Sequence, residues 1–325
     1  MTLTVALLLV VAGLVLLAVG GEALVRAATT LAELAGVSPA VIGLTVVAIG
    51  TSLPELVVSV VAAQGGQPDL AIANVVGSNI FNIAATLGLT ALLIPLPVHG
   101  AAVRLEWPVM FVASALLMLV ARDGTIGRVD GVVFLMGLVF FVAYTVRVAR
   151  RNVSGSEAAT LAAEVESRDI DSPAGGRPKL LVPLAVLAAG VVALVIGGRM
   201  LVDGAVAVAR IAGMSERVIG LTIVAGGTGA PELATSMMAA YRRRTDIAIA
   251  NMIGSNIFNV LGILGLTTLV QPVPVSREML AVDLWWMLGT SLLLLPLLYT
   301  GKRLSRIEGG VLVAAYGAYL VILLR

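Results

Sequence analysis

The sequence contains no cysteine, one histidine and few charges. Charged residues make up 12% of the 325 residues and hydrophobic residues 59%, whereas soluble proteins average about 25% charged. So few charges cannot cover a water-facing surface, which argues against a soluble enzyme, a disordered scaffold or a nucleic-acid-binding protein. The net charge of +2 is too small for a polyanion-binding surface. The missing cysteines exclude disulfides and thiolate metal sites, and the single His99 excludes a multi-histidine metal site.

Long apolar segments dominate what remains. A membrane-spanning helix needs about 20 mainly apolar residues. Ten such segments cover residues 3–25, 39–63, 70–95, 106–121, 129–149, 180–209, 217–241, 246–270, 279–299 and 307–324. The sequence therefore predicts an all-α membrane protein with ten transmembrane helices. The first segment lacks a basic leader, so we expect a retained helix rather than a cleaved signal peptide.

The two halves of the chain are copies of each other. Residues 36–93 align with residues 213–270 at a constant offset of 177, and 33 of the 58 pairs are identical. A polar stretch over residues 150–178 separates the copies. We therefore predict a first membrane repeat over residues 1–149, a cytoplasmic linker over 150–178 and a second membrane repeat over 179–325.

Loop charge predicts how the copies are inserted. Five helices is an odd number, so the second repeat must enter the membrane from the opposite side, which makes two inverted five-helix repeats. The loop over residues 64–69 has no basic residue, whereas its counterpart over 241–246 contains three arginines. Cytoplasmic loops are enriched in Lys and Arg, so we expect residues 241–246 in the cytoplasm and the N-terminus outside the cell membrane.

Two acidic residues occupy equivalent positions near the middle of predicted spans. Glu55 and Glu232 lie in the second and seventh segments, where no Lys or Arg accompanies them. A carboxylate at mid-membrane costs about 2.5–3.5 kcal/mol on insertion scales and needs compensation. A bound cation or a water-filled cavity would supply it. The alternative is a protonated carboxyl group bonded to a neighbouring helix.

A proline precedes each of these acids. Pro54 and Pro231 each lack the amide hydrogen that continues a helix, and glycines lie beside them. We expect both helices to open there and to release backbone carbonyls, those of Ala48 and Ala225. Open backbone at this depth is tolerated where it lines a cavity or finds protein partners. A simple proline kink is the alternative.

Polar residues recur every four positions around these breaks, which places them on one helix face. The stripes are Thr51, Glu55 and Ser59; Thr228, Glu232 and Ser236; Asn74, Ser78 and Asn82; and Asn251, Ser255 and Asn259. Every candidate ligand atom is an oxygen, which suits hard cations such as Ca²⁺ and Na⁺. Alternatively, these side chains serve as polar contacts between helices.

Charged pairs on two other segments have a structural interpretation. Glu22 and Arg26 are four residues apart, as are Arg199 and Asp203. The repeat offset aligns Glu22 with Arg199 and Arg26 with Asp203, so the charges at equivalent positions have opposite signs. Each pair is expected to neutralise itself on one helix.

The duplicated Gly-Thr-x-x-Pro-Glu and Gly-Ser-Asn-Ile-Phe-Asn motifs resemble those of the Ca²⁺/cation antiporter superfamily, most closely the prokaryotic sodium/calcium exchangers. The resemblance covers essentially the whole chain. It implies an inverted bundle in which the broken helices of both repeats meet at four adjacent cation sites, with the first and sixth helices as a sliding gate.

The resemblance also implies roles for individual residues. Glu55 and Glu232 would be the central ligands, and Thr51 and Thr228 would help to hold Ca²⁺. The other ligands it implies are Ser52, Ser78 and Ser255 with the carbonyls of Ala48 and Ala225 at sodium sites, and Asn82 and Asn259 at the middle of the cluster. The chain departs from the family at two positions. Gly229 stands where the second repeat would carry the counterpart of Ser52, and Asn259 stands where some relatives have an aspartate.

These observations predict a secondary antiporter that exchanges Na⁺ for Ca²⁺, with no cofactor, no nucleic-acid partner and no obligate protein partner. Two carboxylates can be neutralised by one Ca²⁺ or by two Na⁺, so the ions compete. Exchange of H⁺ for Ca²⁺ is the close alternative, because protons also neutralise carboxylates. A passive cation channel is a second alternative. An intramembrane enzyme is not expected, because the sequence shows no aspartate pair, zinc motif or serine–histidine pair.

Overall fold

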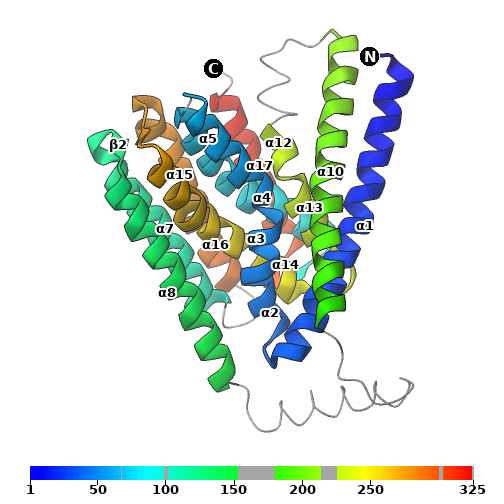
Figure 1. The fold of residues 1–325 in the computed structure, drawn as a ribbon, viewed down its shortest axis with the longest axis horizontal. Helices are drawn as coiled ribbons and strands as arrows, with labels where there is room; N and C mark the ends of the chain where they lie inside the picture. Colours follow the sequence, from blue (N-terminus) through cyan, green and yellow to red (C-terminus); the bar gives the residue numbers. More distant parts are fainter. Residues whose placement is uncertain (67, 99–101, 153–179, 214–224, 300–302, 324–325) are drawn as a thin grey trace.

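The computed structural model describes residues 1–66, 68–98, 102–152, 180–213, 225–299 and 303–323, which are mostly helical. The helices of the first half are α1 (Leu3–Ala35), α2 (Pro39–Ile42), α3 (Ala48–Thr51), α4 (Leu53–Gln64), α5 (Pro68–Ile80), α6 (Gly88–Leu93), α7 (Trp107–Val120) and α8 (Arg128–Asn152). Those of the second half are α10 (Leu181–Ile211), α12 (Ala225–Thr228), α13 (Ala230–Tyr241), α14 (Thr245–Phe258), α15 (Gly265–Val270), α16 (Leu284–Tyr299) and α17 (Arg306–Leu323). Figure 1 shows these helices in one bundle.

Eight helices among the described residues are long and apolar enough to cross a membrane. The pair Pro39–Thr51 and Leu53–Gln64, bent by 43°, can count as a ninth. These spans confirm a multi-pass helical membrane protein. The predicted segment 217–241 begins outside the described residues, which resume with α12 at Ala225.

Both predicted helix breaks are present. Between α3 and α4, Ser52 leaves the helical conformation with φ −85° and ψ 8°. Between α12 and α13, Gly229 does the same with φ −81° and ψ 4°. In each case a proline, Pro54 or Pro231, lies at the start of the following helix. There its missing amide hydrogen costs no hydrogen bond, so each break ends one helix and starts another.

Wider helical turns begin at the end of the Gly-Ser-Asn-Ile-Phe-Asn motif in each half. A π-helical segment, Phe81–Leu87, joins α5 to α6, and Asn259–Leu264 joins α14 to α15. Such turns are rare and are found mostly at functional sites. The most apolar part of Thr245–Val270 is completely buried, so this helix lies at the centre of the bundle.

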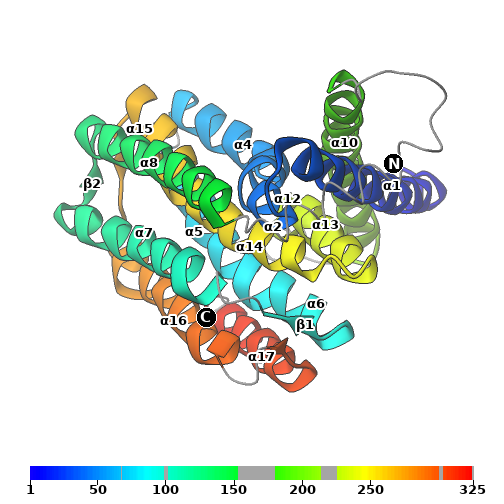
Figure 2. The ribbon, with the colours of Figure 1, turned by 90° about the horizontal axis from the view of Figure 1, so that it is seen from below.

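Helices α1 and α10 lie side by side along one edge of the bundle (Figures 1 and 2). Glycines let their backbones touch: a Cβ at Gly20 would lie 2.9 Å from the Gly190 carbonyl oxygen, and a Cβ at Gly197 would lie 3.0 Å from that of Gly13. Gly204 meets Ala6, so the two helices run antiparallel. The Gly20–Gly190 and Gly13–Gly197 contacts are related by the repeat offset of 177, so α1 and α10 form a reciprocal interface between the two halves.

Two short strand pairs also join the halves. Strand β1 (Leu96–Pro97) pairs with β4 (Arg303–Leu304), and β2 (Thr125–Ile126) pairs with β3 (Val273–Pro274), both antiparallel. In the view of Figure 1, α1 begins and α17 ends at the top of the bundle, whereas α8 ends at the bottom.

Candidate functional site

The breaks place Glu55 and Glu232 in the first turns of α4 and α13. Each residue retains only 1% of its accessible surface. The two carboxyl groups are close enough to interact electrostatically. Free amide hydrogens and the positive end of the helix dipole favour negative charge at such a position. Within the described part of the chain, neither acid has a basic partner.

Side chains on one half reach the other half at this point. Ser52 Oγ donates a hydrogen bond of 3.0 Å to Glu232 Oε1. Thr51 Oγ1 lies 3.4 Å from Asn251 Oδ1. The predicted convergence of the polar stripes on one cluster is therefore present, and the cluster lies where the two breaks meet.

Within each half, the stripes hold neighbouring helices together. Asn74 Nδ2 donates to Ser59 Oγ at 3.0 Å and to the Glu55 carbonyl oxygen at 3.2 Å. In the second half, Asn251 Nδ2 donates to Ser236 Oγ at 3.3 Å. These contacts fix α4 against α5 and α13 against α14, so they position the acids.

Two residues outside the predicted ligand set cross the centre. Asn79 Nδ2 donates to the Asn256 carbonyl oxygen at 3.3 Å, and Asn256 Nδ2 returns a bond of 3.2 Å to that of Asn79. Asn82 donates to Asn256 Oδ1 at 3.1 Å, and Asn259 donates to Asn79 Oδ1 at 3.0 Å. The duplicated Gly-Ser-Asn-Ile-Phe-Asn motif contained this signal, but the four-residue spacing selected its other asparagine.

These bonds use the amide hydrogens and leave acceptor oxygens without donors. Within the described residues, five buried oxygens of the cluster have no hydrogen-bond partner: Glu55 Oε1 and Oε2, Glu232 Oε2, Asn82 Oδ1 and Asn259 Oδ1. Buried acceptors are normally satisfied, because leaving one unpaired costs about 1–3 kcal/mol. A group of bare oxygen acceptors is complementary to a cation.

The structure differs from the prediction at Ala48. Its carbonyl accepts a hydrogen bond of 3.1 Å from the Ser52 amide, so the expectation that it leaves the helical ladder is wrong. The Ala48 oxygen has a second lone pair, and Ser255 Oγ lies 3.5 Å from it.

The remaining predicted residues lie around the acids. Thr228 is half-buried beside Glu55, and Ser78 is buried in α5, one turn before Asn82. Ala225 is the first residue of α12. All the predicted site residues therefore belong to the breaks or to the helices that cross them.

A cavity of about 160 Å³ adjoins this cluster between α10 and the two breaks. Pro54, Pro231 and Thr228 line its inner part, and Arg199 and Asp203 of α10 line it as well. Both charged residues are exposed, so the cavity reaches the surface. In the described structure no ion pair joins Arg199 to Asp203, contrary to expectation, although Glu22 and Arg26 do pair.

Helix α1 packs on α13 beyond Glu232, toward the end of α13 that precedes Arg242. A Cβ at Gly21 would lie 3.3 Å from the Ala234 carbonyl oxygen of α13, whereas one at Gly198, the equivalent position of α10, has only contacts of 3.7 Å or more. Helix α1 therefore packs directly on α13, while α10 leaves the cavity described above.

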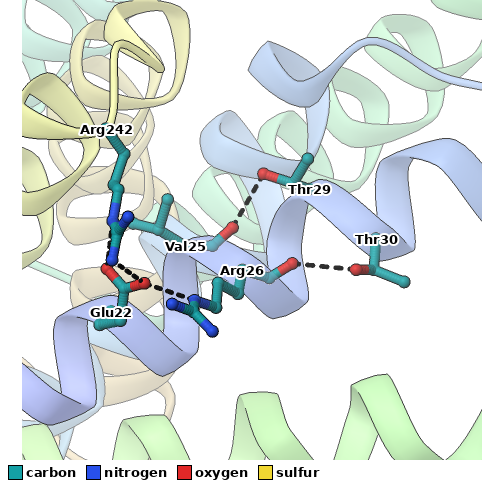
Figure 3. A network of polar contacts seen from close by, with 6 residues as sticks. All are labelled: Glu22, Val25, Arg26, Thr29, Thr30 and Arg242. Carbon is teal, nitrogen blue, oxygen red and sulfur yellow. Dashed lines mark hydrogen bonds and ion pairs between the residues drawn. The ribbon is translucent and has the colours of Figure 1, made fainter.

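An ion-pair network reinforces the contact of α1 with α13 (Figure 3). Glu22 of α1 binds Arg26 on its own helix and Arg242 after α13, with Arg242 Nη2 2.6 Å from Glu22 Oε1 and Nε 2.7 Å from Oε2. The hydrogen bond to Glu22 and its negative charge raise the pKa of Arg242. The repeat counterpart of Arg242 is Gly65, so no equivalent ion pair can form with α10.

The chain is similar to known proteins along nearly its whole length. A family model described as sodium/calcium exchanger protein matches residues 5–147 and 182–325. The chain is 37% identical over 323 residues to the inner membrane protein YrbG of Escherichia coli, covering 99% of this chain and 96% of YrbG. It is 33% identical over 349 residues to the sodium/calcium exchanger MaX1 of Methanosarcina acetivorans, covering 99% of each. Its structure resembles that of the sodium-calcium exchanger NCX_Mj with a TM-score of 0.81 and 30% identity, covering 99% of this chain and 100% of the other.

Proposed function

The chain belongs to the sodium/calcium exchanger family, a family of transporters rather than enzymes, and from this premise we propose that it is a secondary antiporter that exchanges Na⁺ for Ca²⁺ across the cell membrane. The observation that carries the proposal is the group of five buried acceptor oxygens without hydrogen-bond partners, three of which belong to the carboxyl groups of Glu55 and Glu232. Ca²⁺ binds about 6–8 oxygen ligands, and the cluster supplies carboxylate, amide, hydroxyl and carbonyl oxygens.

The proposed ligands follow from their positions. Glu55 and Glu232 bind Ca²⁺ centrally, and Thr51 and Thr228 assist them. Further oxygens come from Ser52, Ser78, Ser255, Asn82 and Asn259 and from the carbonyls of Ala48 and Ala225. Support comes from the hydrogen bonds and burial that hold most of these residues in one cluster.

The proposed architecture is two inverted five-helix repeats with ten transmembrane helices. The repeats are residues 1–149 and 179–325, joined by a cytoplasmic linker over 150–178, with the N-terminus outside. The antiparallel contact of α1 with α10, which are equivalent helices, supports inversion. The arginines after α13 support the orientation, because cytoplasmic loops are enriched in basic residues.

Alternating access follows from the unequal packing of α1 and α10. Helix α1 packs directly on α13, whereas the cavity beside α10 leads from the surface to Thr228. In the opposite state α1 would open and α10 would close. Two carboxylates carry two negative charges, which one Ca²⁺ or two monovalent cations neutralise, and an empty cluster would expose bare charge to the moving helices. Coupling arises because only the neutralised cluster permits the movement.

Calcium uptake by reconstituted vesicles tests the proposal. Purified protein in liposomes loaded with Na⁺ is diluted into medium containing ⁴⁵Ca²⁺ with either Na⁺ or K⁺ outside. We expect uptake only when an outward Na⁺ gradient is present. Uptake driven only by a pH gradient would replace Na⁺ by H⁺ in the proposal, and uptake without any counter-ion would indicate a channel.

Variants of the acids locate the site. Glu55→Gln and Glu232→Gln should each abolish Na⁺-driven uptake, because glutamine keeps the shape of the side chain but removes a charge. Glu278→Gln, an exposed acid at the start of a distant helix, is the matched control and should transport normally. Near-normal transport by either of the first two variants would contradict the assignment.

A further inference from the structure

The two halves of the cluster are not equivalent, because the repeat places Ser52 in one half and Gly229 in the other. Ser52 Oγ donates to Glu232 at 3.0 Å. The mirror-related interaction would join residue 229 to Glu55, but glycine has no hydroxyl group. Neither carboxyl oxygen of Glu55 has a partner at hydrogen-bond geometry in the described part of the chain, although Thr228 lies beside this acid.

The side of the cluster that contains Ser52 gathers several oxygens. Besides the Ser52–Glu232 bond, Thr51 Oγ1 lies 3.3 Å from the Ala48 carbonyl oxygen, and Ser255 Oγ lies 3.5 Å from the same atom. Hydroxyl groups can turn their lone pairs toward a cation. Carboxylate, hydroxyl and carbonyl oxygens are the ligands that a small hard cation prefers.

The aromatic ring of Phe81 occupies the corresponding space on the other side. A Cβ at Gly229 would lie 2.5 Å from Phe81 Cε1 and 2.6 Å from Cδ1. Real Cβ atoms do not approach carbon so closely, so residue 229 has no room for a side chain while the ring is there. The ring turns its Cδ1–Cε1 edge toward residue 229, and the edge of an aromatic ring carries partial positive charge.

A second aromatic residue fixes the position of this ring. Phe81 and Tyr316 of α17 make an edge-to-face contact, with centroids 5.6 Å apart and planes at 75°. The repeat counterpart of Phe81 is Phe258, and a Cβ at Gly262 would lie 2.6 Å from its Cδ2. No ring separates Ser52 from Glu232, because their side chains are hydrogen-bonded directly.

We propose that Phe81, together with Gly229, closes the Glu55 side of the cluster to sodium, so that this side lacks the sodium site formed on the Ser52–Glu232 side. Phe81 is then a specificity-determining residue that sets how many sodium ions are exchanged for each Ca²⁺. Ca²⁺ still binds between the two carboxylates. This inference rests on the proposed function and concerns the number of counter-ions.

The experiment measures coupling stoichiometry in proteoliposomes. Net ⁴⁵Ca²⁺ flux is recorded across a series of imposed Na⁺ gradients at clamped membrane potential, and the gradient at which flux stops gives the number of Na⁺ per Ca²⁺. The variant Gly229→Ser/Phe81→Ala restores the hydroxyl group and removes the ring. We expect its stoichiometry to exceed that of the unmodified protein by one Na⁺.

Two further variants complete the test. Ser52→Gly removes the hydroxyl on the other side and should lower the stoichiometry, with at least a tenfold loss of apparent Na⁺ affinity, which corresponds to about 1.4 kcal/mol. Phe258→Ala removes the repeat-related ring and should leave the stoichiometry unchanged. Melting temperature and Ca²⁺ binding of each variant establish that it is folded.

The outcomes distinguish failure of the proposed function from failure of the role assigned to Phe81. Absence of Na⁺-driven uptake in the unmodified protein would refute the proposed function. Normal uptake with the same null gradient in the folded double variant would refute the role of Phe81. If the double variant does not fold, Ser52→Gly decides: an unchanged stoichiometry overturns the inference, and a reduced one supports it.

Discussion

Ser52 Oγ donates a hydrogen bond of 3.0 Å to Glu232 Oε1, which joins the two helix breaks through residues that are 180 positions apart in sequence. The bond satisfies one carboxylate oxygen and leaves Glu232 Oε2 without a donor among the described residues. The acid is therefore held in a defined orientation while one oxygen remains available.

Removing this hydroxyl group should weaken ion binding. Hydrogen bonds to charged groups contribute about 1.5–3 kcal/mol, so Ser52→Ala should lower the apparent ion affinity at least tenfold. Isothermal titration of purified protein measures the effect. Ser114→Ala is the control, because Ser114 is also buried but donates at 3.0 Å to the Met110 carbonyl oxygen in its own helix. Equal losses in both variants would argue against a specific role.

Removing either buried acid should stabilise the ion-free protein. Glu55 and Glu232 are each 1% exposed and interact electrostatically without basic partners in the described structure. Burying charge without a partner is costly, so Glu55→Gln and Glu232→Gln should raise the melting temperature in chelator. Both variants should also lose the rise produced by Ca²⁺, which amounts to about 2.7 kcal/mol at a concentration of 100 Kd. Differential scanning fluorimetry with and without Ca²⁺ is the measurement. A lower melting temperature in chelator would contradict the prediction.

Breaking the Glu22–Arg242 ion pair should loosen the contact of α1 with α13. Met238 lies beneath Gly21, with its Cβ 3.5 Å from where a Cβ of Gly21 would be. The sequence has no cysteine, so Met238→Cys supplies a single thiol whose maleimide labelling reports opening. Arg242→Gln should accelerate labelling about two- to fivefold, because exposed ion pairs contribute modestly.

Arg243 provides the control for this prediction. It lies next to Arg242 and has a positive φ of 59°, but it does not contact Glu22 in the described ion pairs. Arg243→Gln should therefore leave the labelling rate unchanged. Equal acceleration by both substitutions would show that general loop charge, rather than the ion pair, holds α1 in place.

The charges that line the cavity should act on ion entry in opposite directions. Asp203 and Arg199 face the cavity that leads to Thr228. Asp203→Asn should raise the KM for Ca²⁺ on that side of the membrane several-fold, and Arg199→Gln should lower it, with kcat nearly unchanged. Both effects should fade at high ionic strength, because salt screens exposed charges. Changes of the same sign would indicate a structural role for the two residues.

Much of the site followed from local sequence rules. Pro54 and Pro231 predicted the two breaks, because proline cannot continue a helix. The four-residue spacing of Thr51, Glu55 and Ser59 predicted a shared helix face. Burial of all three and the contacts they make agree with that arrangement.

Other features depend on how distant helices pack. The spacing rule did not select Asn79 and Asn256, whose reciprocal bonds cross the centre. The same rule predicted Arg26 as the only ion-pair partner of Glu22, whereas Glu22 also binds Arg242, which lies in a loop more than two hundred residues away in sequence. Neither contact is encoded within a window of a few residues.

The amino-acid sequence by itself determined the membrane class, the duplication and the helix faces that carry the polar residues, because these depend on composition and on the periodicity of a helix. Only the tertiary structure decided that Phe81 fills the space beside Gly229, that Ser52 reaches Glu232, and that α1 packs directly on α13 while α10 leaves a cavity. Those outcomes arise from side-chain volume and from contacts between segments far apart in the chain, which no local pattern specifies.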